Sequence, residues 1–138
     1  MANANLVSQW GQINEIFGEN HQTDPNGEVI YVEDATYEQL SKAKEKAPDF
    51  WDDEYQFNDA PSQKEFLDFL KANPQFKAEV YLVSPVSRSD YRIEICGVRA
   101  LNNDKNTSIL YNWVNSLEDA YEPTEYGEQD SDIRAWWD

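Results

Sequence analysis

Apolar side chains recur at helical spacing in four stretches of the chain, which are separated by glycine, proline and polar residues. In the first stretch Leu6, Trp10 and Ile13 fall on one face of a helix, and Gly18 ends the pattern. By the same criterion, amphipathic helices are predicted over residues 4–17, 36–47, 62–73 and 107–121.

The third predicted helix has a marked beginning and end. Ser62 followed three residues later by Glu65 is a capping box, in which each side chain satisfies a backbone N–H of the other residue. Pro48 and Pro74 stop the second and third helices, because proline has no N–H and clashes with the preceding turn.

Strands are predicted over residues 28–33, 76–83 and 90–100. The last two are joined by a short connection that contains Pro85, so they predict an antiparallel hairpin. Gly97 interrupts the alternation of the final strand and indicates a β-bulge. Cys96 lies beside it in an apolar pattern and is expected to be a buried strand residue.

These elements predict an α+β fold, with a small antiparallel sheet of three or more strands and about four helices packed mainly on one face. A chain of 138 residues with 40% apolar residues can form one hydrophobic core. We therefore predict a single domain over residues 1–121. The polar, acidic residues 122–138 are predicted to form a C-terminal tail that can be mobile.

Negative charge is the strongest departure from an ordinary composition. The chain has 27 aspartates and glutamates against 11 lysines and arginines, a net charge of −16. Residues 1–59 carry −10 and residues 106–138 carry −7, whereas residues 60–105 carry +1. Such charge repels nucleic acid and anionic membranes and attracts basic surfaces. We therefore expect a basic protein as the partner, with no direct binding to nucleic acid or membrane.

Two acidic clusters are the candidate partner-binding sites. The first surrounds Phe50, Trp51 and Tyr55 and consists of Asp49, Asp52, Asp53, Glu54 and Asp59. The second follows the last predicted helix and consists of Glu118, Asp119, Glu122, Glu125, Glu128, Asp130 and Asp132.

Two features of the second cluster favour a function. Glu118 and Glu122 would share a face at a helix C-terminus, where the helix dipole disfavours anions, so local stability does not explain them. Trp136 and Trp137 are expected to be an exposed aromatic pair, of the kind enriched in protein interfaces. The competing interpretation of both clusters is a solvated surface that serves only solubility.

No sequence pattern marks a catalytic or metal site. His21 is the single histidine and Cys96 the single cysteine, too few ligands for a usual zinc site. No nucleophile or phosphate-loop motif occurs. A spacing like that of a calcium loop occurs at Gln22, Asp24, Asn26, Gly27 and Glu33. Its first position is not aspartate, and a turn that enters a strand explains it better. We expect no enzyme activity, catalytic residue, metal or cofactor.

The charge predicts a non-enzymatic inhibitor that binds the basic surface of a nucleic-acid-binding protein or complex. Rows of carboxylates would mimic nucleic-acid phosphates, as in phage anti-defence proteins or nuclease inhibitors. The alternatives are an immunity protein, or a general interaction module that docks its acidic tail on a basic partner. A carboxylate enzyme acting on a cationic or sugar substrate is a weaker alternative. Without a signal-peptide pattern or long apolar segment, the expected location is the cytoplasm of a bacterium, or of a host cell if phage-encoded.

Overall fold

The structure is a computed structural model that describes residues 4–18, 21–23, 29–56, 60–86, 88–117, 125–129 and 131–137. In chain order its elements are α1 (Ala4–Phe17), β1 (His21–Thr23), β2 (Val29–Ala35), α2 (Tyr37–Lys46), the 3-10 turn η1 (Pro48–Phe50), α3 (Gln63–Ala72), β3 (Lys77–Val83), β4 (Arg92–Leu101), α4 (Asp104–Ser116), β5 (Glu125–Gln129) and β6 (Asp132–Trp136).

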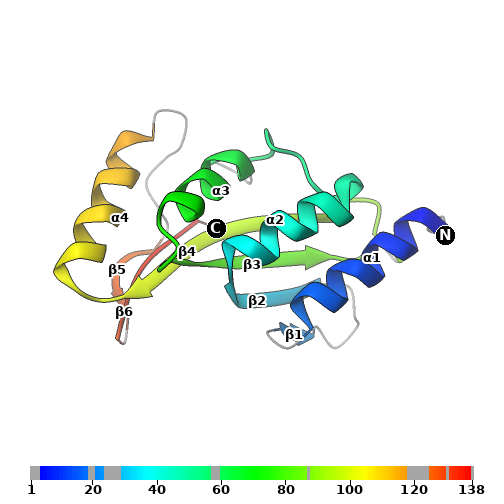
Figure 1. Ribbon diagram of the computed structural model, residues 1–138, viewed down its shortest axis with the longest axis horizontal. Coiled ribbons are helices and arrows are strands. Elements are labelled where there is room, and N and C mark those ends of the chain that lie inside the picture. The colour runs from blue at the N-terminus through cyan, green and yellow to red at the C-terminus, as the bar shows by residue number, and fades with distance from the viewer. Residues whose placement is uncertain are drawn as a thin grey trace.

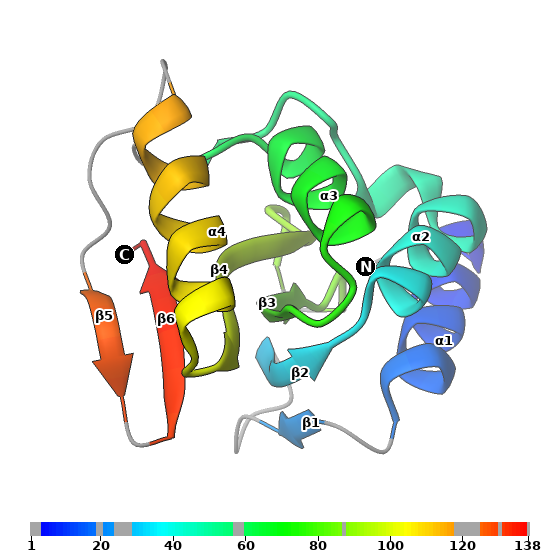
Figure 2. The ribbon, with the colours of Figure 1, turned by 60° about the vertical axis from the view of Figure 1, so that its left-hand side comes forward.

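The six described strands form one antiparallel sheet in the order β1-β2-β3-β4-β6-β5. Figures 1 and 2 show the α-helices gathered on one face of this sheet, with α1 beside α2 and α4 lying over β6. We call the opposite face the helix-free face. The arrangement confirms the predicted α+β fold with an antiparallel sheet and helices mainly on one side.

The core lies between the sheet and the helices. Leu82 and Ile95 contribute from the central strands, and Leu40, Phe66 and Leu70 from the helices, all fully buried. The amphipathic patterns predicted this division, because the apolar stripe of each helix must face the apolar side of the sheet.

The capping box at α3 is confirmed. Ser62 Oγ accepts a hydrogen bond from the Glu65 backbone N–H at 3.1 Å, and Glu65 Oε1 accepts one from the Ser62 N–H at 2.9 Å. Thr36 and Gln39 form an equivalent box at the start of α2. Both boxes satisfy N–H groups that would otherwise lack partners at a helix start.

The predicted bulge at Gly97 is also confirmed. Glu79 pairs with Gly97 and Val80 with Ile95, so Cys96 has no partner across the β3–β4 ladder. Cys96 is fully buried, as expected, and burial raises the pKa of its thiol. A Cβ on Gly97 would lie 2.8 Å from the Ala135 carbonyl oxygen, too close for any side chain.

A buried ion pair joins the middle of the sheet to its last strand. Arg134 on β6 donates to both oxygens of Glu79 on β3, through Nε at 2.6 Å and Nη2 at 2.8 Å. The Tyr31 hydroxyl on β2 donates to the same carboxylate at 2.6 Å. Burial and this carboxylate raise the pKa of Tyr31 well above its ordinary value. The network lies on the helix-free face, because the residues on either side of each member point into the core.

The prediction that residues 122–138 form a tail is wrong for β5 and β6. Strand β6 pairs with β4 from Leu101↔Asp132 to Gly97↔Trp136, and β5 pairs with β6. Ile133, Ala135 and Trp137 enter the core on alternate positions, with Trp137 only 3% exposed. This apolar burial holds the acidic C-terminal segment in the sheet.

The predicted bounds of the last helix also need correction. Its N-cap is Asn103, whose side chain accepts from the Asn106 N–H, so α4 begins before residue 107. It ends at Ser116, because Leu117 is extended. The expected helical pair of Glu118 and Glu122 is therefore not part of α4, and both residues lie outside the described ranges.

We predict that Gly97→Ala lowers the free energy of unfolding by about 1–3 kcal/mol, because the added methyl must displace backbone. Gly11→Ala is the matched control. Gly11 lies in α1 with nothing within 4 Å of a new Cβ, so this change should stabilise by about 0.5–1 kcal/mol. Urea unfolding of the two variants measures both values. Equal stabilities would contradict the bulge geometry.

Candidate functional site

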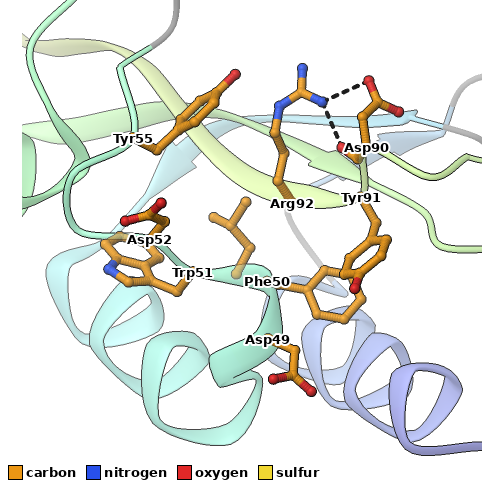
Figure 3. A pocket seen from close by; sticks show the side chains of 9 residues that line it. Asp49, Phe50, Trp51, Asp52, Tyr55, Asp90, Tyr91 and Arg92 are labelled. Carbon is orange, nitrogen blue, oxygen red and sulfur yellow. Dashed lines mark hydrogen bonds and ion pairs between the residues drawn. The ribbon is translucent and has the colours of Figure 1, made fainter.

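The candidate site is a cleft of about 440 Å³ between η1, the segment that follows it, and the beginning of β4. Figure 3 shows Trp51, Asp52 and Tyr55 on one side and Phe50 and Tyr91 on the other. Among the described residues, the lining consists of Asp49, Phe50, Trp51, Asp52, Tyr55, Asp90, Tyr91, Arg92 and Ile93. We call it the aromatic cleft.

Phe50 anchors one side of the aromatic cleft. Pro48 begins the η1 turn directly after α2, and the turn buries Phe50. Its ring lies 6.0 Å from that of Trp10 on α1 and 5.1 Å from that of Tyr91. These contacts position Tyr91 against a rigid core side chain.

Asp49 is held by helix α1. Its Oδ2 accepts hydrogen bonds from Gln9 Nε2 at 2.7 Å and from Asn5 Nδ2 at 3.1 Å, while its backbone N–H donates to Gln9 Oε1 at 3.0 Å. These amides are neutral, so they hold the Asp49 side chain in place without supplying a cation.

Asp52 and Asp53 have different environments although they are adjacent. Asp52 is exposed, and its Oδ1 accepts the Glu54 N–H at 3.0 Å, which orders the turn. Asp53 accepts from Trp51 Nε1 at 2.7 Å and pairs with Lys44 at 3.0 Å. The Trp51 hydrogen bond and then Lys44 lower the pKa of Asp53. Asp53 therefore orients Trp51 rather than lining the cleft.

Four lining residues from the hairpin were not among the predicted site residues: Asp90, Tyr91, Arg92 and Ile93. The Asp90 carboxylate binds Arg88 at 2.6 Å and Arg92 at 3.0 Å. The Arg88 hydrogen bond is the main cause of a pKa for Asp90 well below its ordinary value. Asp90 is therefore a carboxylate at the edge of the cleft that already binds two arginines.

Arg92 is itself held by the side of the cleft. Its Nε donates to the buried Glu94 at 2.8 Å, and its guanidinium lies 5.7 Å from the centroid of the Tyr55 ring. Asp90 and Glu94 together offset this single positive charge. With Asp49, Asp52, Asp90 and Arg92 counted, the lining keeps an excess of negative charge.

Two residues of the predicted C-terminal region, Asp132 and Trp136, do not line the cleft. Asp132 is paired with Arg99 at 2.9 Å, and the Trp136 ring lies 5.1 Å from the guanidinium of Arg134. Asp132 pairs with Leu101, nine positions along β4 from Arg92, a distance of about 30 Å at strand spacing. Asp132 and the aromatic cleft therefore do not form one surface.

The other predicted site residues have these placements. Trp137 is a core residue 5.6 Å from Phe66, so the expected exposed pair with Trp136 is wrong. Glu54 is exposed near the cleft without lining it. Glu125 and Glu128 lie on β5. Outside the described residues lie Asp59, Glu118, Asp119, Glu122 and Asp130.

Chemically, the aromatic cleft is suited to holding a cation between rings. The lining residues that the structure describes include no histidine, cysteine, serine or threonine. Within the described ranges, no three His, Cys, Asp or Glu side chains are grouped to hold a metal ion, and no helix has the length and apolarity to cross a membrane. No protein-family model, curated protein or solved structure matches the chain.

We predict that Asp53→Asn lowers the free energy of unfolding at pH 7 by about 0.5 kcal/mol, a small value because Lys44 and Asp53 remain 42% and 38% exposed. A lowered pKa in the folded state stabilises above the unfolded value near 3.8, and this contribution disappears as pH falls through the folded value. The deficit of the variant should therefore shrink as the pH is lowered below about 4, as measured by urea unfolding. Glu54→Gln, an exposed neighbour, is the control, and a deficit independent of pH would contradict the assignment.

Proposed function

We propose that this protein is a non-enzymatic binding protein that docks on a basic surface of a protein partner through the aromatic cleft. The observation that carries the proposal is the combination of three carboxylates with four aromatic side chains around one cavity, in a chain of net charge −16. Aromatic residues supply contact area at the centre of interfaces, and surrounding charge steers a partner of opposite sign.

The partner class that we propose is a nucleic-acid-binding protein or complex, which the chain would inhibit by occupying a surface that normally faces phosphates. The long-range attraction that a net charge of −16 exerts on cations favours such a surface. The immunity-protein alternative uses the same contact, with a basic nuclease as the partner. The alternative of an interaction module that docks through a flexible C-terminal tail does not apply, because β6 belongs to the sheet.

The internal ion pairs narrow the set of carboxylates that would face a partner. Asp53 and Asp132 are neutralised by Lys44 and Arg99, respectively. Asp49, Asp52 and Glu54 have no cationic side chain within ion-pair distance in the described part of the chain. We therefore assign the contact to the end of the molecule that carries η1, rather than to both predicted clusters.

Charge-matched variants test this proposal. Asp52→Lys and Glu33→Lys change the net charge equally, but Asp52 lines the aromatic cleft whereas Glu33 is an exposed residue of β2 outside its lining. We expect Asp52→Lys to weaken binding about tenfold, because it places a cation against the partner's cation, and Glu33→Lys to weaken it less than threefold.

The measurement has two stages. The wild-type protein first captures partners from an extract of its native host at low salt, and salt releases them. The affinity of each purified partner for both variants, and for nucleic acid with and without the wild-type protein, is then determined. Equal affinities of the two variants would exclude the cleft as the contact site. A partner whose affinity for nucleic acid is unchanged by the wild-type protein would exclude the inhibitor function.

A further inference from the structure

The aromatic cleft has the shape and chemistry of a site for one planar cation. Trp51 and Tyr55 lie across from Phe50 and Tyr91, and Asp52 lies between the first two rings (Figure 3). A volume of about 440 Å³ is ample for one long side chain and lies within the usual range of ligand pockets. The cavity therefore combines aromatic faces with carboxylates around the same space.

The chain already binds one guanidinium in this way at the edge of the cleft. Arg92 lies 5.7 Å from the centroid of the Tyr55 ring while it donates to Asp90 at 3.0 Å and to Glu94 at 2.8 Å. A ring face and two carboxylates thus satisfy a single arginine. Asp52 offers a further carboxylate beside Tyr55 and Trp51, with no ion pair of its own in the described part of the chain.

A second internal arginine shows the same combination. Arg134 lies 5.1 Å from the centroid of the Trp136 ring and contacts both oxygens of Glu79. The lysine ion pairs differ, because Lys44 and Lys64 stay 42% and 62% exposed, against 23% for Arg92 and 11% for Arg134. Among these four cations, the guanidinium groups of Arg92 and Arg134 thus lie close to rings and are the less exposed.

We infer that the aromatic cleft binds an arginine side chain of the protein partner, with its guanidinium against Trp51 and paired with Asp52. This inference rests on the proposed function and names the group that the cleft receives. Arginine fits better than lysine because its planar, weakly hydrated guanidinium stacks on rings and forks onto carboxylates, whereas ammonium is compact and strongly hydrated.

Peptide binding to the full chain tests the inference without knowledge of the partner. The probes are three capped peptides, Gly-Gly-Arg-Gly-Gly and its lysine and trimethyllysine counterparts, which carry the same charge. The readout is the NMR shift of the Trp51 indole N–H, which donates to Asp53 and is assigned with Trp51→Phe. We expect the arginine peptide to bind at least about threefold more tightly than the lysine peptide. Asp52→Asn should remove most of this preference, and Glu33→Gln should leave it unchanged.

Each other outcome overturns the arginine assignment. Equal binding of the arginine and lysine peptides, lost in Asp52→Asn, would leave a cleft for any cation and keep the proposed function. Tighter binding of trimethyllysine would assign the cleft to a quaternary ammonium instead. If no peptide moves the Trp51 signal, the cleft does not receive single cationic side chains, and the Asp52→Lys and Glu33→Lys comparison decides the proposed function separately.

Discussion

The ion pair between Glu79 and Arg134 is the constraint on which the sheet depends. A buried carboxylate without a partner costs several kcal/mol. Glu79 on β3 is therefore stable in the sheet only when Arg134 on β6 is paired with it. Because β6 lies between β4 and β5, the same contact fixes the far edge of the sheet. The Tyr31 hydroxyl extends the constraint to β2. Three strands, β2, β3 and β6, thus share one polar centre on the helix-free face.

This constraint also explains where the charge of the molecule resides. The arginines of β4 and β6 are each matched by a carboxylate: Arg92 by Glu94, Arg99 by Asp132 and Arg134 by Glu79. These three ion pairs therefore add little to the external field. The excess negative charge belongs to other parts of the chain, among them the aromatic cleft, where it can attract a partner from a distance.

Much of the fold could be predicted from local patterns. The Ser62–Glu65 box and the Gly97 bulge depend on neighbouring residues, and both are confirmed. Strand β6 was missed although Ile133, Ala135 and Trp137 alternate as a half-buried strand should, because the acidic residues around them suggested a tail. The alternation was the available signal.

The site was only half predictable for a different reason. Asp49 and Asp52 stand together in the sequence with their aromatic neighbours, so composition alone revealed them. Asp90 and Arg92 lie about forty positions away, and only the pairing of η1 with the hairpin brings them to the same cavity. Local sequence also could not tell that Asp53 faces Lys44 while Asp52 faces solvent.

The hydrogen bonds from Gln9 and Asn5 to Asp49 make the first helix part of the cleft. Linkage is reciprocal, so a ligand that stabilises Asp49 in its present position also stabilises the packing of α1. A change that displaces α1 in turn reduces the affinity for that ligand. Through Asp49, the stability of α1 is therefore coupled to the affinity of a cleft whose other lining residues include the beginning of β4.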